Sequence, residues 1–173
     1  MRRLALLLSA AALGACRQDM HDQPKLEPYE SSAFFADGRS VRPRVEGTVA
    51  RGRLRPDDHL YRGRQEGEPA TSYPFAITAD VLAVGREQYG VFCAICHDHA
   101  GTGQGMAVQR GIKAPPSLHL DRLRDAPHGY LFDVISNGYG SMYDYSDRIP
   151  ARDRWSIIAY VRALQLSRDA TLD

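Results

Sequence analysis

Apolar residues recur with the spacing of amphipathic helices in the second half of the chain. The pattern predicts helices over about 78–92, 127–138 and 150–166, with Thr78 or Asp80 capping the first of them. The second helix has a proline near its first turn and ends at an Asn-Gly pair, both common helix signals. On the third helix, four apolar residues follow the i, i+3, i+4, i+7 spacing that places them on one face: Ile157, Tyr160, Val161 and Leu164.

The domain that these helices predict contains a long loop for its size. A Gly- and Pro-rich connection spans about 101–116, and no convincing strand or internal repeat is present in the sequence. We therefore expect a small all-α domain over about 75–168, followed by a short tail, 169–173. Because protein interiors are close-packed, we expect something other than side chains to fill the middle of so small a domain.

Residues 16–74 have no sustained helical or strand period. Six of the ten prolines of the chain lie in this segment. It has too little apolar surface to order alone, although aromatic and aliphatic residues recur along it like anchors. We expect a long extended N-terminal arm that becomes ordered on a partner or on its own domain.

Arginine is concentrated in the middle of this arm. Eight arginines lie between Arg39 and Arg64, against three acidic residues. This local excess of positive charge fits a docking surface for lipid headgroups or for an acidic partner subunit. It fits a solvated loop without a partner equally well.

Residues 1–15 have the three parts of a secretory signal peptide. Met1-Arg2-Arg3 is basic, residues 4–13 are almost wholly apolar, and small residues precede Cys16. The cysteine at this boundary resembles a bacterial lipobox, in which it is acylated and becomes the new N-terminus. The alternative is a plain signal peptide with a chance cysteine. Since two or three acyl chains anchor a protein stably, we expect an exported chain tethered by lipid at the periplasmic face of a membrane.

The composition of the chain narrows the possible partners. Lys and Arg number 22 and Asp and Glu 21, so the net charge of +1 provides no cation excess for nucleic acid. Apolar residues at 43% and charged residues at 25% are ordinary for a globular protein. Three cysteines, an odd number, cannot all pair in disulfides.

The candidate chemistry lies in Cys93-Ala94-Ile95-Cys96-His97, which is the CxxCH sequence of c-type haem attachment. Two cysteines at this spacing can reach both vinyl groups on one porphyrin edge, and His97 is then placed over the iron. The alternatives are a zinc half-site, which needs two further ligands, and a dithiol redox pair, which needs a βαβ context. The sequence offers neither, so we expect one covalent haem c with His97 as its proximal ligand.

The second axial ligand decides between an electron carrier and an enzyme, because a closed iron transfers electrons and an open one binds ligands. Met142 follows a full helix and lies in a glycine-containing turn that lets the backbone approach a porphyrin closely. We expect Met142 to be this ligand, with a core-packing role as the alternative. Met106 follows His97 too soon to reach the distal face, and His119 and His128 are the other residues placed for ligation.

Other residues are candidates for contacts around the haem. A carbonyl of Pro115 or Pro116 is expected to accept the free ring N–H of His97, unless this stretch is a simple turn. The haem propionates need hydrogen-bond donors, for which the sequence offers four candidates: Arg110, Tyr143, Tyr145 and Trp155. Trp155 fits the core equally well.

Together, the helices and motifs resemble a class I c-type cytochrome over about 80–166. The resemblance rests on Gly85 and Tyr89 before the CxxCH motif, on the proline pair, on the Met142 turn and on the last helix. It implies that the first and last helices cross, with Gly85 allowing close contact. It also implies ligation by His97 and Met142, with a proline carbonyl behind the histidine.

The arm carries a second resemblance. Residues 20–25, 34–39 and 43–52 are similar to the mono-haem cytochrome c subunit of bacterial alternative complex III, a membrane quinol oxidoreductase. This implies that the arm wraps neighbouring subunits, including a multi-haem cytochrome, and that Cys16 carries lipid. Electrons would pass to a terminal oxidase or a soluble carrier. We expect an electron-transfer subunit, not itself an enzyme; the alternatives are a stand-alone lipoprotein cytochrome and a haem peroxidase or gas-binding enzyme.

Overall fold

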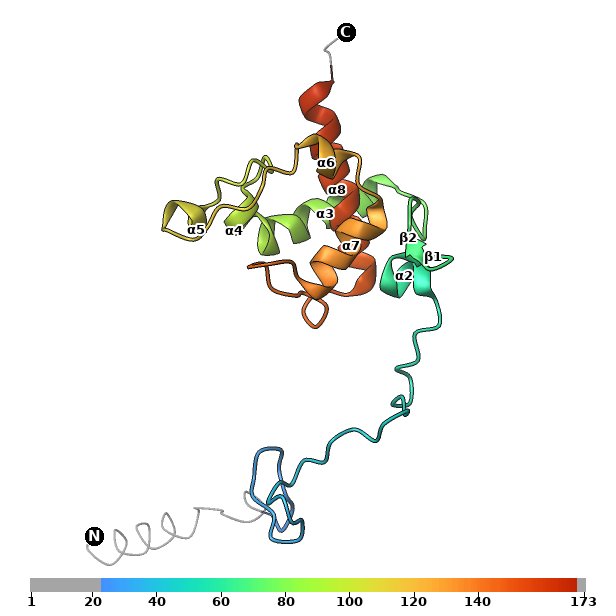
Figure 1. Cartoon of the computed structure of the whole chain (residues 1–173), viewed down its shortest axis with the longest axis vertical. Helices are drawn as coiled ribbons and strands as arrows, with labels where there is room; N and C mark the ends of the chain where they lie inside the picture. Colours follow the sequence, from blue (N-terminus) through green and yellow to red (C-terminus); the bar gives the residue numbers. More distant parts are fainter. Residues whose placement is uncertain (1–22, 171–173) are drawn as a thin grey trace, which may run out of the picture. The chain divides into compact units, whose positions relative to one another are not determined.

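The computed structural model describes residues 23–170, and the chain divides into two compact units between Gly52 and Arg53 (Figure 1). The predicted signal peptide and Cys16 lie outside the described residues. Within residues 23–170, no helix is both long enough and apolar enough to cross a bilayer.

The second unit is a helical domain with one very small sheet. Its longer helices are α3 (Ala79–Phe92), α7 (His128–Asn137) and α8 (Ala151–Asp169). Four short helices accompany them: α2 (Asp58–Arg62), α4 (Ala94–His97), α5 (Met106–Gln109) and α6 (Asp121–Arg124). Strands β1 (Arg64–Gln65) and β2 (Glu68–Pro69) form an antiparallel pair, in which Arg64 lies opposite Pro69. The all-α prediction is confirmed for the described residues apart from this pair.

The three predicted helices are present, and their ends follow the sequence signals. Thr78 caps α3, since its hydroxyl oxygen accepts a hydrogen bond from the Val81 N–H at 3.3 Å. α7 ends at Gly138, whose φ of 79° lies in the region that favours glycine. α8 continues to Asp169, beyond its expected end near Leu166.

Helices α3 and α8 cross at very short range. A Cβ atom on Gly85 would lie only 2.0 Å from the carbonyl oxygen of Ser156 on α8. Beside this contact, the rings of Tyr89 and Tyr160 pack with their centroids 5.5 Å apart. Because any larger residue would push the two backbones apart, Gly85 fixes how closely α3 and α8 approach.

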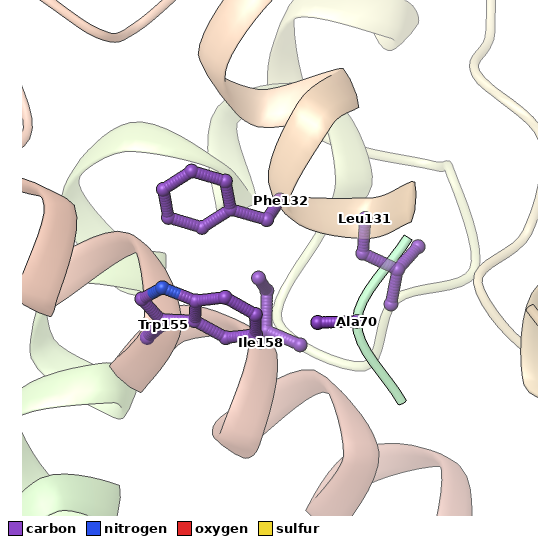
Figure 2. Packing of buried hydrophobic residues seen from close by; sticks show 5 residues of the cluster. All are labelled: Ala70, Leu131, Phe132, Trp155 and Ile158. Carbon is purple, nitrogen blue, oxygen red and sulfur yellow. The ribbon is translucent and has the colours of Figure 1, made fainter. Parts of the chain in front are cut away.

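A core of buried side chains joins α7 and α8 to the segment that precedes α3. In Figure 2 the Phe132 and Trp155 rings lie face to face, and their centroids are 4.8 Å apart. Ala70, Leu131 and Ile158 complete this cluster. A second cluster lies against α3 and α8 and consists of Tyr89, Ala94, Ile149, Ile157 and Val161.

Residues 53–74 pack as part of the helical domain, although the sequence placed them in the arm. Trp155 Nε1 donates a hydrogen bond to the Leu60 carbonyl at 2.9 Å. The Ala70 N–H donates to the Gly63 carbonyl at 2.8 Å, and the Gly129 N–H donates to the Ala70 carbonyl at 2.7 Å. The expected boundary at residue 74 is therefore too late, because isolated apolar anchors between turns carry no helical or strand period.

The first unit has no helix among its described residues and one isolated β-bridge, between Ser31 and Arg39. In the loop that this bridge closes, the Phe34 and Phe35 rings meet edge to face with centroids 4.9 Å apart. The Arg42 guanidinium lies 4.1 Å from the centre of the Phe35 ring. Phe34 nevertheless remains 87% exposed, so this unit presents a large aromatic side chain on its surface.

The close crossing of α3 and α8 predicts opposite effects for two glycines on the same helix. Gly85→Ala should lower the free energy of unfolding by roughly 1–3 kcal/mol, because the added methyl meets backbone atoms that cannot move aside. Gly90→Ala should raise it by about 0.5–1 kcal/mol, because no atom of the described residues beyond its own stretch of helix lies within 4 Å of its Cβ position. Urea unfolding followed by circular dichroism measures both. Equal stability of the two variants would contradict the close crossing.

Candidate haem-binding site

An apolar cavity is lined by α3, α7, α8 and the loops that follow α4 and α7. One lobe has a volume of about 250 Å³, and a second lobe of about 550 Å³ shares His97, Pro115 and Met142 with the first. Within residues 23–170, no Asp or Glu lines either lobe. The helices supply most of the apolar lining: Tyr89, Phe92, Leu131, Val134, Ile135, Ile157, Ile158 and Val161.

The CxxCH residues line this cavity from a single turn of helix. Cys93 ends α3 and begins α4, and the His97 N–H donates to the Cys93 carbonyl at 2.9 Å. Among the described residues, Cys93 and Cys96 form no disulfide. Burial together with the neighbouring Cys96 raises the pKa of the Cys93 thiol to about 12. Burial also lowers the pKa of His97, which favours the neutral imidazole that binds metals.

A tight turn after α7 places Met142 at the cavity. The N–H of Tyr139 donates to the Met142 carbonyl, and the N–H of Met142 donates to the Tyr139 carbonyl, both at 3.0 Å. A Cβ atom on Gly138 would lie 2.5 Å from the Met142 carbonyl oxygen, so the turn depends on glycine there. Met142 is half-buried and lines both lobes.

The other candidate axial ligands lie away from the cavity lining. Met106 is 54% exposed. His119 Nε2 lies 2.6 Å from the Ala100 carbonyl oxygen. The His128 ring stacks on Tyr73 at 4.4 Å between centroids, and its Nδ1 accepts a hydrogen bond from Arg162 Nε at 3.2 Å. Of the residues considered for the second ligand, Met142 alone lines the cavity within the described chain.

The expected hydrogen bond between His97 and a proline carbonyl is not formed. His97 Nδ1 is buried without a partner among the described residues. Pro115 and Pro116 do line the second lobe, but the Pro115 carbonyl faces Gly103, where a Cβ atom would lie 2.5 Å from its oxygen. Pro115 and Pro116 therefore line the same lobe as His97, but within the described residues neither proline carbonyl accepts a hydrogen bond from His97 Nδ1.

The loop after His97 is organised by Asp98. Its carboxylate accepts hydrogen bonds from the N–H groups of Ala100 at 2.6 Å, Thr102 at 3.1 Å and Gln104 at 2.9 Å, and also from the Thr102 hydroxyl. Burial raises the pKa of Asp98, but these hydrogen bonds outweigh it and lower the pKa to about 2. The Tyr89 hydroxyl donates to the Asp98 carbonyl at 2.8 Å, which ties α3 to the loop.

The four predicted propionate donors divide into two pairs. Tyr143 and Tyr145 line the cavity as expected. Arg110 is exposed and does not line it. Trp155 is fully buried with its N–H bonded to the Leu60 carbonyl, so it is a core residue in this structure and not a donor to the cavity.

Sequence reasoning missed two cations at the cavity. Lys113 lines both lobes, and Arg122 lines the second. For Lys113 the sequence does contain a signal for a place at the cavity, because this lysine lies close in sequence to the proline pair that is expected near the haem. Arg122 carried no such signal, since its place depends on how the short helix α6 folds back toward the cavity.

The residues present fit a covalently bound haem. The cavity is apolar, contains the two free cysteines and carries a histidine with an unpartnered buried ring nitrogen. The described residues contain no group of three or more His, Cys, Asp or Glu side chains that could hold a metal ion.

Comparison with known proteins agrees with this chemistry. Residues 80–161 match the family model described as cytochrome c oxidase, cbb3-type, subunit III. This match indicates that the helical domain is a c-type cytochrome domain. The expected class I cytochrome c fold and a covalently bound haem c with its iron are thereby confirmed for this cytochrome domain.

The remaining comparisons are more distant. A chain of the reducing HAO-like protein complex of Kuenenia stuttgartiensis is 17% identical, with a TM-score of 0.47. The match covers 61% of this chain and 54% of that chain, so this chain spans about half the length of that structure. No curated protein matches the chain.

The Asp98 hydrogen bonds predict a stability loss in the cytochrome domain. Asp98→Asn should lower the free energy of unfolding by about 1–3 kcal/mol, because an amide offers one acceptor oxygen where the carboxylate offers two. Denaturant unfolding of the haem-loaded protein measures this loss. Glu87→Gln, which neutralises an exposed acid on α3, is the matched control and should unfold like the wild type. Equal losses in both variants would contradict a special role for Asp98.

Proposed function

We propose that this chain is a lipid-anchored, mono-haem c-type cytochrome that passes single electrons at the periplasmic face of a membrane. We propose further that it is a subunit of a respiratory quinol-oxidising complex like alternative complex III. In this role it receives electrons from a multi-haem cytochrome subunit and passes them to a terminal oxidase or a soluble carrier.

The observation that carries the electron-transfer role is that His97 and Met142 line the same apolar cavity as Cys93 and Cys96. Cys93 and Cys96 would hold the haem through two thioether bonds, and His97 and Met142 would occupy its two axial positions. A haem iron closed by histidine and methionine supplies a one-electron Fe(III)/Fe(II) couple and has no free position for a substrate.

The lining residues also influence the potential of this couple. Methionine ligation and an apolar surrounding both favour the ferrous state, because they disfavour the extra positive charge of ferric iron. Ile135, Ile157 and Val161 contribute such surroundings. The midpoint potential of the proposed haem should therefore be relatively high, which suits the domain to accept electrons.

Exposed apolar residues lie where electrons would enter and leave. Ile112 and Tyr143 both line the cavity and are 58% and 81% exposed. Ile95, between the two haem-binding cysteines, is 50% exposed. A partner that packs on these side chains comes close to the cavity, and closeness is the main requirement for electron transfer.

The arm supports the subunit role through its surface. Phe34 is 87% exposed and Tyr29 is fully exposed. Tyr29 also has a φ of 76°, an uncommon backbone conformation for a residue other than glycine. Exposed aromatic and aliphatic residues along this segment fit contact with neighbouring subunits, and acylation of Cys16 would hold the arm at the membrane.

The proposed ligation predicts a spectroscopic loss. Met142→Ala should abolish the weak far-red absorption band that a thioether bound to ferric haem gives, and should lower the midpoint potential. Met106→Ala is the matched control, because Met106 is exposed and does not line the cavity, and it should keep the band. Optical spectra of the oxidised protein and a redox titration measure both effects.

An opposite result would favour an enzyme. If the wild type lacked the far-red band and bound carbon monoxide readily in the ferrous state, its iron would be open. The peroxidase or gas-binding alternative would then replace the electron carrier.

The proposed complex predicts co-purification. When membranes are solubilised gently and this chain is captured by a C-terminal tag, a multi-haem cytochrome and membrane-embedded subunits should elute with it. Haem staining of the separated subunits and mass spectrometry identify them. Recovery of the chain alone, with its haem intact, would favour the stand-alone lipoprotein cytochrome.

A further inference from the structure

The Lys and Arg side chains around the cavity have no opposite charge among the described lining residues. Lys113 and Arg122 line it, and apart from His97 they are its only cationic lining residues in the described part of the chain. No carboxylate of the described residues lines either lobe. The two cations therefore have no anionic neighbour in the lining to neutralise them.

Neither cation is engaged elsewhere. Within residues 23–170, Lys113 and Arg122 take part in no ion pair and their side chains donate no hydrogen bond, unlike Arg162, whose guanidinium donates to the carbonyls of Leu123 and Arg124. Both are exposed, so their charged ends remain hydrated while they border the apolar interior. They are thus free to pair with an anion at the cavity rim.

The ligand that this lining fits is largely apolar and carries negatively charged groups beside Lys113 and Arg122. We propose that Lys113 and Arg122 bind the two propionate carboxylates of the haem, in place of the Arg110 and Trp155 expected from the sequence. They are positioning residues, because they act on the propionates and not on the iron. This inference rests on the haem occupying the cavity, as the proposed function does.

The neighbouring titratable groups leave these two cations as the main influence on the propionates. The other titratable side chains that line the cavity include no carboxylate and no further Lys or Arg within the described chain; they are tyrosines and the residues of the CxxCH motif: Tyr89, Cys93, Cys96, His97, Tyr130, Tyr139, Tyr143 and Tyr145. A carboxylate close to an opposite charge has a lowered pKa. Removing either cation should therefore make a propionate easier to protonate.

The test is a pH titration of the haem-loaded protein, followed by proton NMR of the haem and by the midpoint potential. Lys113→Gln and Arg122→Gln should each raise the pKa of a propionate by roughly one unit. The pH range in which the midpoint potential varies should move upward with it. Lys113→Arg and Arg122→Lys keep the charge and should titrate like the wild type.

Arg110→Gln is the matched control, because it removes the same charge from an exposed position that does not line the cavity. It should leave the propionate titration unchanged. The proposal is overturned if either Gln variant titrates like the wild type, or if Arg110→Gln shifts the titration as much. The haem content and the far-red band of each variant are recorded separately, so loss of ligation is distinguished from loss of a propionate contact.

Discussion

The close approach of α3 and α8 at Gly85 is the constraint on which the site depends. The two helices carry much of the cavity lining, with Tyr89 and Phe92 on α3 and Ile157 and Val161 on α8. Cys93 begins the CxxCH turn directly at the end of α3, so a shift of this helix would move every haem-binding residue of the motif. A residue larger than glycine at the crossing would therefore disturb both the fold and the position of the cofactor.

The local elements of the domain could be predicted from the sequence, whereas its long-range packing could not. The three longer helices have capping residues and an apolar period, and both are visible within a window of fewer than twenty residues. The segment from Arg53 to Pro74 has neither. Its position depends on contacts with residues distant in sequence, such as the hydrogen bond from Trp155 to the Leu60 carbonyl. A local sequence pattern does not predict such long-range contacts.

The same division holds within the site. Cys93, Cys96 and His97 form a contiguous motif, and Met142 follows a recognisable glycine turn, so all four could be named in advance and all line the cavity. For the hydrogen-bond donors to the haem propionates, the sequence offers only residue type as a basis for prediction. In the structure, Arg110 lies at the surface and Trp155 in the core, so neither lines the cavity. Residue type alone does not distinguish these positions, because they depend on how the loops fold.

The positive charge at the cavity also affects the stability of a ferric iron, and therefore the midpoint potential of the proposed haem. An apolar lining with two hydrated cations at its rim opposes the oxidised state unless an anion compensates. The propionates of the proposed haem would be the anions nearest to these cations, since no carboxylate of the described chain lines the cavity. The potential should therefore depend on how fully Lys113 and Arg122 neutralise the propionates. In the proposed site, ligation by Met142 would set the general range of the potential, and Lys113 and Arg122 would adjust it within that range.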